Sequence, residues 1–278
     1  MHVDQVDVPA EVVAALVAEQ FPEWRGLPVR PLPTTGTVNA LFRLGAEIVL
    51  RFPLQPTADP ELRAELRREQ EHARLLGPHL PTALPEPLGL GEPGPGTGPW
   101  TAYRWIPGEP IQPGRVGDLN AFARDLAAVV TALHRVDTGG QVVWPGSAGA
   151  GRWPPTMPGA VVPGQQWPAH RHRPSRRGVG PLPGHPRHDS ADVWIHADLM
   201  PGNLLVRDGR LAAVIDLGTV NVGDPAVDLI PAWNLFDAAS RETYRRALGV
   251  DDATWERGVA GHCCRRSTRC RTTSRPTR

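Results

Sequence analysis

The chain has 278 residues and a formal net charge of +1 at pH 7, and arginine supplies all of its Lys+Arg count. A charge this close to zero gives no general attraction for nucleic acid or an anionic membrane, so we expect neither partner. No apolar run approaches the roughly 20 residues of a membrane span. Asp4 and Asp7 stand where a signal peptide would be basic, which predicts a cytoplasmic protein.

The first hundred residues predict a small lobe that contains both helices and strands. Helices are indicated by apolar residues three and four apart, and strands by short apolar runs bounded by turn residues. Pro-rich connectors separate the second helix from the last strand. The expected elements are a helix over 9–21, a turn at 34–37, a hairpin of strands over 40–44 and 48–52, a helix over 60–76 and a strand over 100–106.

The later part of the chain predicts a larger, mainly helical lobe. Its clearest helix covers 118–136, where apolar residues form one continuous stripe. Short strands are expected over 193–195, 204–206 and 212–215. The dipeptide Asp208-Gly209 lies between the last two and is a strong signal for a hairpin turn.

The run from His196 to Asn203, followed by Asp216, carries the chemistry that the sequence suggests. Asp198 and Asn203 are five residues apart, so one loop can present a carboxylate to a substrate hydroxyl and an amide to a metal ion. The hairpin then returns the chain, and Asp216 follows its second strand as a charged metal ligand. Phosphoryl transfer needs these parts because its catalysis is mostly positioning and charge neutralisation. The expected metal is Mg²⁺, which suits carboxylate, amide and phosphate oxygens.

These residues resemble the aminoglycoside phosphotransferase family, relatives of the protein kinases whose H-x-D-x4-N and D-x-G motifs have the same spacing. The resemblance covers about residues 1–144 and 191–256. It implies an α+β, two-lobed protein-kinase-like fold. A small, β-rich nucleotide-binding lobe would cover 1–105, and a larger, mainly helical catalytic lobe would cover 106–278.

The resemblance also implies roles for the catalytic residues. Asp198 would orient and deprotonate the acceptor hydroxyl, and His196 would support the loop. Asn203 and Asp216 would bind Mg²⁺. Ala197 stands where glycine is usual, and a positive φ there would cost about 1 kcal/mol.

Nucleotide-binding residues are implied in the first lobe. Arg51 matches the family's phosphate-binding lysine and keeps its charge with a different reach. Glu69 is its expected ion-pair partner, with Glu71 as the alternative. The remaining positions implied are Gly36, Thr37 and Asn39 in the nucleotide-covering hairpin, and Tyr103 and Trp105 near the hinge. Asp224 and Asp228 resemble carboxylates that the family buries behind the catalytic loop.

Two segments, 145–190 and 258–278, do not fit this pattern. The first is rich in proline and acid-free as far as residue 188, and the second contains arginines and cysteines but no carboxylate. Shifted by one base from residue 260, the tail is compatible with an apolar string that resembles the family's C-terminal helix. We therefore interpret both segments as frameshifted and poorly ordered, the first from composition alone.

The sequence predicts a monomeric phosphotransferase that uses ATP or GTP and Mg²⁺ and acts on a hydroxyl of an aminoglycoside or similar small molecule. Macrolide, homoserine, choline and fructosamine kinases share the fold and remain alternatives. A nucleotide-binding pseudokinase or nonfunctional remnant is the rival from another class. Nucleic-acid binding through the arginine-rich tail is ranked last.

Overall fold

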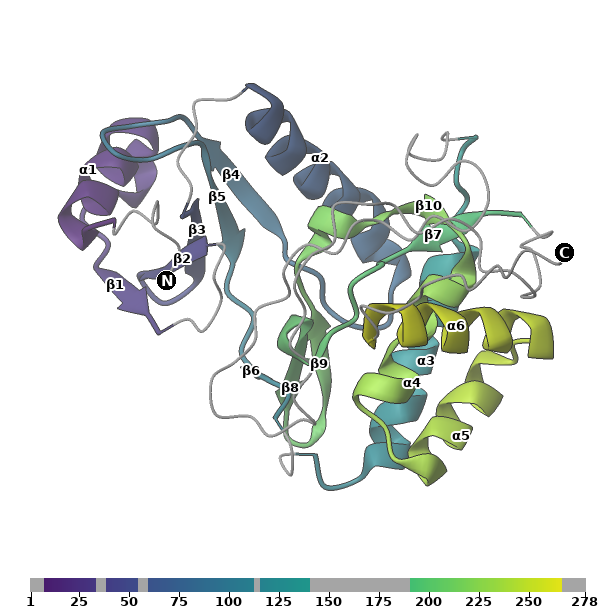
Figure 1. The fold of residues 1–278 in the computed structure, drawn as a ribbon. Coiled ribbons are helices and arrows are strands. Elements are labelled where there is room, and N and C mark those ends of the chain that lie inside the picture. The colour runs from purple at the N-terminus through teal and green to yellow at the C-terminus, as the bar shows by residue number, and fades with distance from the viewer. Residues whose placement is uncertain (1–7, 34–38, 55–59, 113–115, 141–190, 267–278) are drawn as a thin grey trace, which may run out of the picture.

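The computed structural model describes residues 8–33, 39–54, 60–112, 116–140 and 191–266, with side chains to 259. Its first part is a five-stranded antiparallel sheet in the order β1-β2-β3-β5-β4 (Figure 1). The sheet is formed by β1 (Val29–Leu32), β2 (Asn39–Leu44), β3 (Ile48–Pro53), β4 (Pro87–Gly91) and β5 (Trp100–Arg104). Helix α1 (Ala10–Gln20) packs beside β1. Its Val13, Leu16 and Val17 are buried in one hydrophobic core with side chains of the sheet.

Alternation along β3 decides what each face of this sheet carries. Ile48, Leu50 and Phe52 are buried, because successive side chains of a strand point to opposite faces. The ring of Phe52 stacks on that of Trp100 at 5.0 Å between centroids, inside the core. The same alternation places Arg51 on the face opposite to this core, where it is available to the site.

Helix α2 (Pro60–Leu76) connects the sheet with the second lobe (Figure 1). The Nε2 of Gln70 donates to the Gly89 carbonyl at 2.7 Å and fixes the helix to β4. Ala73 and Leu76, at the other end of α2, belong to the larger hydrophobic core. One helix therefore couples the position of the sheet to that of the catalytic lobe.

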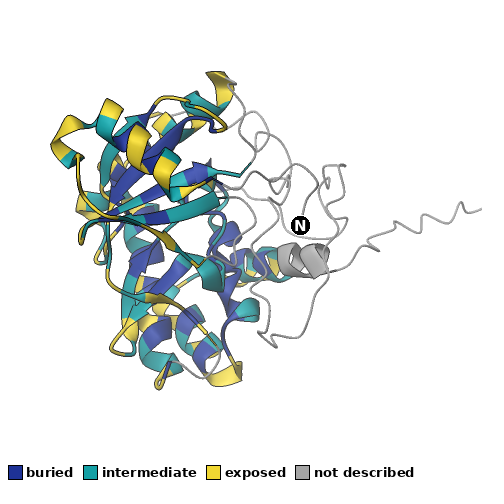
Figure 2. Cartoon of the chain, turned by 90° about the vertical axis from the view of Figure 1, so that its left-hand side faces the viewer, coloured by how far each residue is buried: buried dark blue, intermediate teal, exposed yellow. Residues whose placement is uncertain are grey.

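The second lobe is built around α3 (Leu119–Arg135), which Asp118 caps by accepting from the backbone of Asn120 and Ala121. Its apolar stripe packs on α5, and each lobe has its own cluster of buried side chains (Figure 2). The other helices are α4 (Pro231–Asn234), α5 (Ala238–Leu248) and α6 (Asp252–Arg266). Two small sheets pair β7 (Val193–Ile195) with β10 (Asn221–Gly223), and β6 (Glu109–Pro110) with β8 (Leu204–Arg207) and β9 (Arg210–Val214).

The expected α+β, two-lobed architecture is confirmed, and so is the β8–β9 hairpin. Asp208 and Gly209 at its turn have φ values of 53° and 75°. The interpretation of the stretch before β5 as connectors alone was wrong, because it contains β4. The strand was missed because Pro87, Gly89 and Gly91 weaken its apolar pattern.

The division at residue 105 remains a prediction. Segment 145–190 lies outside the described residues, whereas α6 carries the described backbone to Arg266, into the segment 258–278. Within the described part of the chain, no helix has the length and apolarity needed to cross a membrane.

Gly91 gives a test of this packing. A Cβ at Gly91 would lie 2.0 Å from Cε2 of the buried Trp100 ring, so Gly91→Ala should lower the free energy of unfolding by about 1–3 kcal/mol. Gly77→Ala is the matched control, because a Cβ there meets nothing within 4 Å, and it should change stability by less than about 0.5 kcal/mol. Urea unfolding followed by tryptophan fluorescence measures both. Equal losses in the two variants would contradict this account.

Candidate active site

The loop between β7 and β8 brings Asp198 and Asn203 together. The Nδ2 of Asn203 donates to the Asp198 carbonyl at 2.9 Å and to its Oδ2 at 3.0 Å. A short 3₁₀ turn, Pro201–Asn203, closes this distance by reversing the chain. The amide therefore orients the carboxylate, and the atom of Asn203 that can bind a metal is Oδ1.

Asp216 lies at the end of β9, beside the same loop. The backbone N–H of Ile215 donates to the Asn203 carbonyl at 2.9 Å, which ties the two expected metal ligands together through adjacent backbone. Asp216 has a φ of 66°, a left-handed conformation that is uncommon for a residue other than glycine. Its side chain is 48% exposed, so the carboxylate is accessible from solvent.

These oxygens suit Mg²⁺ but do not enclose it. Among the described residues, no group of three or more His, Cys, Asp or Glu side chains could hold a metal ion. Mg²⁺ commonly binds through one or two carboxylates and completes its shell with water and substrate phosphates. Asp216 and the Oδ1 of Asn203 fit that pattern, in which the nucleotide supplies the remaining oxygens.

Arg51 connects Glu69 with Asp216. Its Nη1 lies 2.5 Å from Oε1 of the buried Glu69, and its Nη2 lies 3.6 Å from Oδ1 of Asp216. Burial would lower the pKa of Arg51, but the two carboxylates outweigh it and raise the pKa above its usual value. Glu69, and not the alternative Glu71, is therefore the ion-pair partner. The pair places a permanent positive charge beside the expected metal site.

Of the two expected hinge residues, only Tyr103 lies near this charge, because Trp105 follows β5 and its backbone N–H donates to the Glu47 carbonyl at 2.7 Å. Tyr103 is buried, and its ring centroid lies 5.8 Å from the Arg51 guanidinium carbon. Burial and the charge of Glu69 raise the pKa of its phenol, which stays neutral. The ring of Trp105 lies under the guanidinium of Arg43 at 3.8 Å.

The other implied nucleotide positions are only partly described. Asn39 begins β2, opposite Pro53 of β3. Gly36 and Thr37 lie outside the described residues. The structure therefore places one end of the expected nucleotide-covering hairpin.

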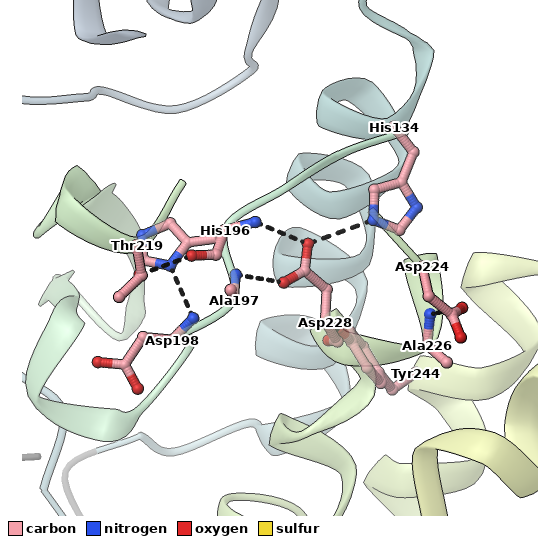
Figure 3. A network of polar contacts seen from close by, with 9 residues as sticks. All are labelled: His134, His196, Ala197, Asp198, Thr219, Asp224, Ala226, Asp228 and Tyr244. Carbon is pink, nitrogen blue, oxygen red and sulfur yellow. Dashed lines mark hydrogen bonds and ion pairs between the residues drawn. The ribbon is translucent and has the colours of Figure 1, made fainter. Parts of the chain in front are cut away.

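The start of the catalytic loop is held by Asp228, which is fully buried (Figure 3). Its Oδ2 accepts from the backbone N–H of His196 at 3.0 Å, and its Oδ1 from that of Ala197 at 2.9 Å. The Nε2 of His134, at the end of α3, lies 3.3 Å from Oδ2. The hydroxyl of Tyr244, in α5, donates to the Asp228 carbonyl at 2.9 Å.

His196 supports the loop from inside the core. Its Nδ1 accepts from the Asp198 backbone N–H at 3.3 Å, which assigns the proton of a neutral imidazole to Nε2. That Nε2 is buried and has no hydrogen-bond partner among the described residues. Leu76, Leu199 and Leu217 are among the apolar side chains around it. A buried donor without a partner lowers the stability of the folded protein by about 1–3 kcal/mol. An apolar residue of similar shape would avoid that loss.

Asp224 differs from the expectation of a buried carboxylate. Its side chain is 26% exposed, and the guanidinium of Arg257, in α6, contacts both of its oxygens at 2.9 and 3.1 Å. Oδ1 also accepts from the Ala226 N–H and caps the following 3₁₀ turn, Pro225–Leu229. The sequence showed the carboxylate but not its partner, because Arg257 approaches from a helix that the sequence analysis did not predict.

Three supporting residues were missed by sequence reasoning. His134 was covered only by the predicted helix over 118–136, and Tyr244 and Arg257 were not identified as contributors. Each contacts its acidic partner across 16 to 94 positions of sequence. A polar residue ending an apolar stripe, as His134 does, was the one local signal available.

Comparisons with known proteins identify a family and agree with the fold. The sequence profile described as APH, phosphotransferase enzyme family, matches residues 31–260. The GDP complex of wild-type aminoglycoside 2'-phosphotransferase-IIIa is similar with a TM-score of 0.65 and 17% identity, over 92% of this chain and 88% of that chain. The streptomycin-ATP-APH(2")-IIa ternary complex has a TM-score of 0.59 and 15% identity, over 92% and 86%.

A macrolide 2'-phosphotransferase, MphH from Brachybacterium faecium, has a TM-score of 0.54 and 21% identity, over 92% of this chain and 88% of that chain. At these identities the structural similarities show the fold. No curated protein gives a significant sequence match.

Ala197 gives a test of backbone strain in the loop. Its φ of 65° lies in the left-handed region, where the Cβ costs roughly 1–2 kcal/mol. Ala197→Gly removes that cost and adds unfolded-state entropy, so we expect it to raise the free energy of unfolding by up to about 1 kcal/mol. Ala213→Gly in β9, where φ is not positive, should lower it by about 1 kcal/mol. Thermal and urea unfolding of both variants would show the opposite signs, and a loss for both would refute the strain.

Proposed function

The chain belongs to the phosphotransferase enzyme family, and from that membership we propose that it transfers the terminal phosphoryl group of ATP or GTP to a hydroxyl group of an aminoglycoside or similar small molecule. The hydrogen-bonded pair of Asp198 and Asn203, with Asp216 beside it, is the observation that carries the proposal. The nucleotides named for similar structures, GDP and ATP, support the donor.

In this proposal Asp198 is the catalytic residue. Its carboxylate accepts the proton of the acceptor hydroxyl while the hydroxyl oxygen forms a bond to the terminal phosphorus. The bond from that phosphorus to its bridging oxygen breaks, and the nucleoside diphosphate leaves with the electron pair. Asn203 restricts the carboxylate to one orientation by donating to its Oδ2 at 3.0 Å.

Charge on the phosphates is balanced by a cation and by Arg51. Mg²⁺, when bound by Asp216 and the Oδ1 of Asn203, supplies charge neutralisation at the phosphates. Glu69 holds the Arg51 guanidinium at 2.5 Å, so the fork is oriented before the nucleotide binds. Arginine can contact two phosphate oxygens at once, where lysine offers a point charge.

The acceptor class rests on the similar structures. They include a complex with the aminoglycoside streptomycin and a macrolide 2'-phosphotransferase. Both classes carry hydroxyl groups that Asp198 could deprotonate. Incubating the chain with ATP or GTP, Mg²⁺ and panels of both classes, and detecting phosphorylated products by mass spectrometry, identifies donor and acceptor together.

A nucleotide-binding protein without transfer activity is the second candidate, and one contact favours it. Arg51 lies 3.6 Å from Asp216, so a guanidinium competes with Mg²⁺ for the expected metal ligand. This candidate predicts thermal stabilisation by ATP in the presence of Mg²⁺ with no phosphorylated product from any acceptor. Product formation that requires Asp198 excludes it.

Asp198→Asn tests the catalytic assignment. The amide cannot accept a proton, so the turnover number should fall by about 10²–10⁴-fold while the melting temperature and nucleotide affinity change little. Asp208→Asn is the control, because its side chain is 94% exposed at the hairpin turn and its left-handed φ suits asparagine. Initial rates of nucleoside diphosphate release measure both variants. Equal activity of Asp198→Asn and the parent would refute the assignment.

Asp216→Asn tests the metal site. Loss of a charged ligand should raise the Mg²⁺ concentration for half-maximal rate by roughly 100-fold or more, because even partners that only orient metal ligands contribute 10–100-fold. A magnesium titration at saturating nucleotide measures this shift, again with Asp208→Asn as the control. An unchanged magnesium requirement with lower activity would contradict metal binding by Asp216 and would leave its contact with Arg51 as its role.

A further inference from the structure

His134 lies behind the catalytic loop, and among the described residues its side chain contacts Asp228 (Figure 3). Its Nε2 lies 3.3 Å from Oδ2 of Asp228. A carboxylate oxygen accepts and does not donate, so Nε2 carries the proton of this bond. The contact joins two residues 94 positions apart, one at the end of α3 and the other in the turn Pro225–Leu229.

The other bonds of Asp228 explain what this contact can control. Its Oδ1 and Oδ2 accept from Ala197 and His196, the two residues directly before Asp198. A rotation of the carboxylate would lengthen both bonds at once. Oδ2 has a second donor, His134, and that donor comes from outside the loop. His134 can therefore keep the Asp228 carboxylate from rotating when the loop moves.

Backbone strain in the loop acts on these hydrogen bonds. Ala197 is held at a φ of 65°, an unfavourable conformation for a residue with a Cβ, and its N–H is bonded to Oδ1 of Asp228. Relaxation of Ala197 would move the following residue, Asp198. The anchoring helix α3 resists such movement, because Leu126, Val130 and Leu133 are buried in the larger core.

We propose that His134 is a positioning residue for phosphoryl transfer: its Nε2–H fixes the Asp228 carboxylate, which holds the strained start of the catalytic loop and so places Asp198. This inference rests on the proposed function. Tyr244 also bonds Asp228, but its hydroxyl contacts the backbone carbonyl and leaves the carboxylate free to turn. The two contacts therefore have different consequences for catalysis.

Substitution of His134 tests the proposal in the full chain. Glutamine can present an amide N–H at nearly the reach of Nε2, whereas leucine removes the donor. For His134→Leu we expect the turnover number to fall by about 10–100-fold, the range for groups that orient a catalytic ligand, with the nucleotide KM changed by less than about threefold. His134→Gln should retain activity within about threefold of the parent.

Tyr244→Phe is the matched control, since it removes one buried hydrogen bond from the same residue. It should lower the melting temperature with less than about a threefold change in the turnover number. Adding Ala197→Gly should recover part of the activity that His134→Leu loses, because it removes the strain. Equal turnover losses in His134→Leu and Tyr244→Phe, or no rescue in a folded His134→Gln, would overturn the proposal.

Amide hydrogen exchange separates this inference from the proposed function. The N–H groups of His196 and Ala197 should exchange about 10-fold faster in His134→Leu than in the parent, while His134→Gln keeps them protected. If no acceptor is phosphorylated, the function fails and the exchange result still decides the positioning. Unchanged exchange in His134→Leu would overturn it. If that variant does not fold, His134→Asn, whose amide reaches only as far as Nδ1, takes its place with the same expectations.

Discussion

The catalytic loop depends on the hydrogen bonds that the buried carboxylate of Asp228 accepts. This carboxylate accepts from two successive backbone N–H groups, those of His196 and Ala197, and from the imidazole of His134. Removal of a carboxylate from water is costly unless donors replace the lost hydration. The loop supplies two of those donors, so its backbone stabilises the buried carboxylate of Asp228. The geometry that stabilises the carboxylate also places Asp198.

A second charged group links the lobes. Arg51 comes from the sheet, Glu69 from α2, and Asp216 from the end of the β8–β9 hairpin. Helix α2 carries Glu69 and packs Ala73 and Leu76 into the larger core about one and two turns later. A movement of α2 would therefore change the Arg51 ion pair and the packing of the catalytic lobe together. In the proposed enzyme, nucleotide binding would be sensitive to the same movement.

Several positions around this site have locally unfavourable conformations or contacts. Ala197 and Asp216 have left-handed backbones, and the Nε2 of His196 is buried without a described partner. Such features are unfavourable locally and persist where the surrounding structure holds them. They occur on the loop and hairpin that carry Asp198 and Asn203. Their concentration there supports a site selected for geometry.

Local spacing was enough to predict that Asp198 and Asn203 lie together. Asp198 and Asn203 are five residues apart, and the Asp208-Gly209 turn returns the chain to Asp216, so short-range geometry brings these residues together. The short apolar run over 48–52 likewise predicted a strand, which the structure has as β3. These features depend on chain stereochemistry over a few residues. A sequence pattern can express them.

Tertiary packing decided the supporting contacts. His134 meets Asp228, and Arg257 meets Asp224, because helices far apart in the chain pack against one turn. The choice of Glu69 over Glu71 depended on which face of α2 turns toward the sheet. No spacing rule connects residues separated by 94 positions, since their distance is set by the packing of whole elements. The sequence by itself determined the reactive groups, and only the fold determined what holds them in place.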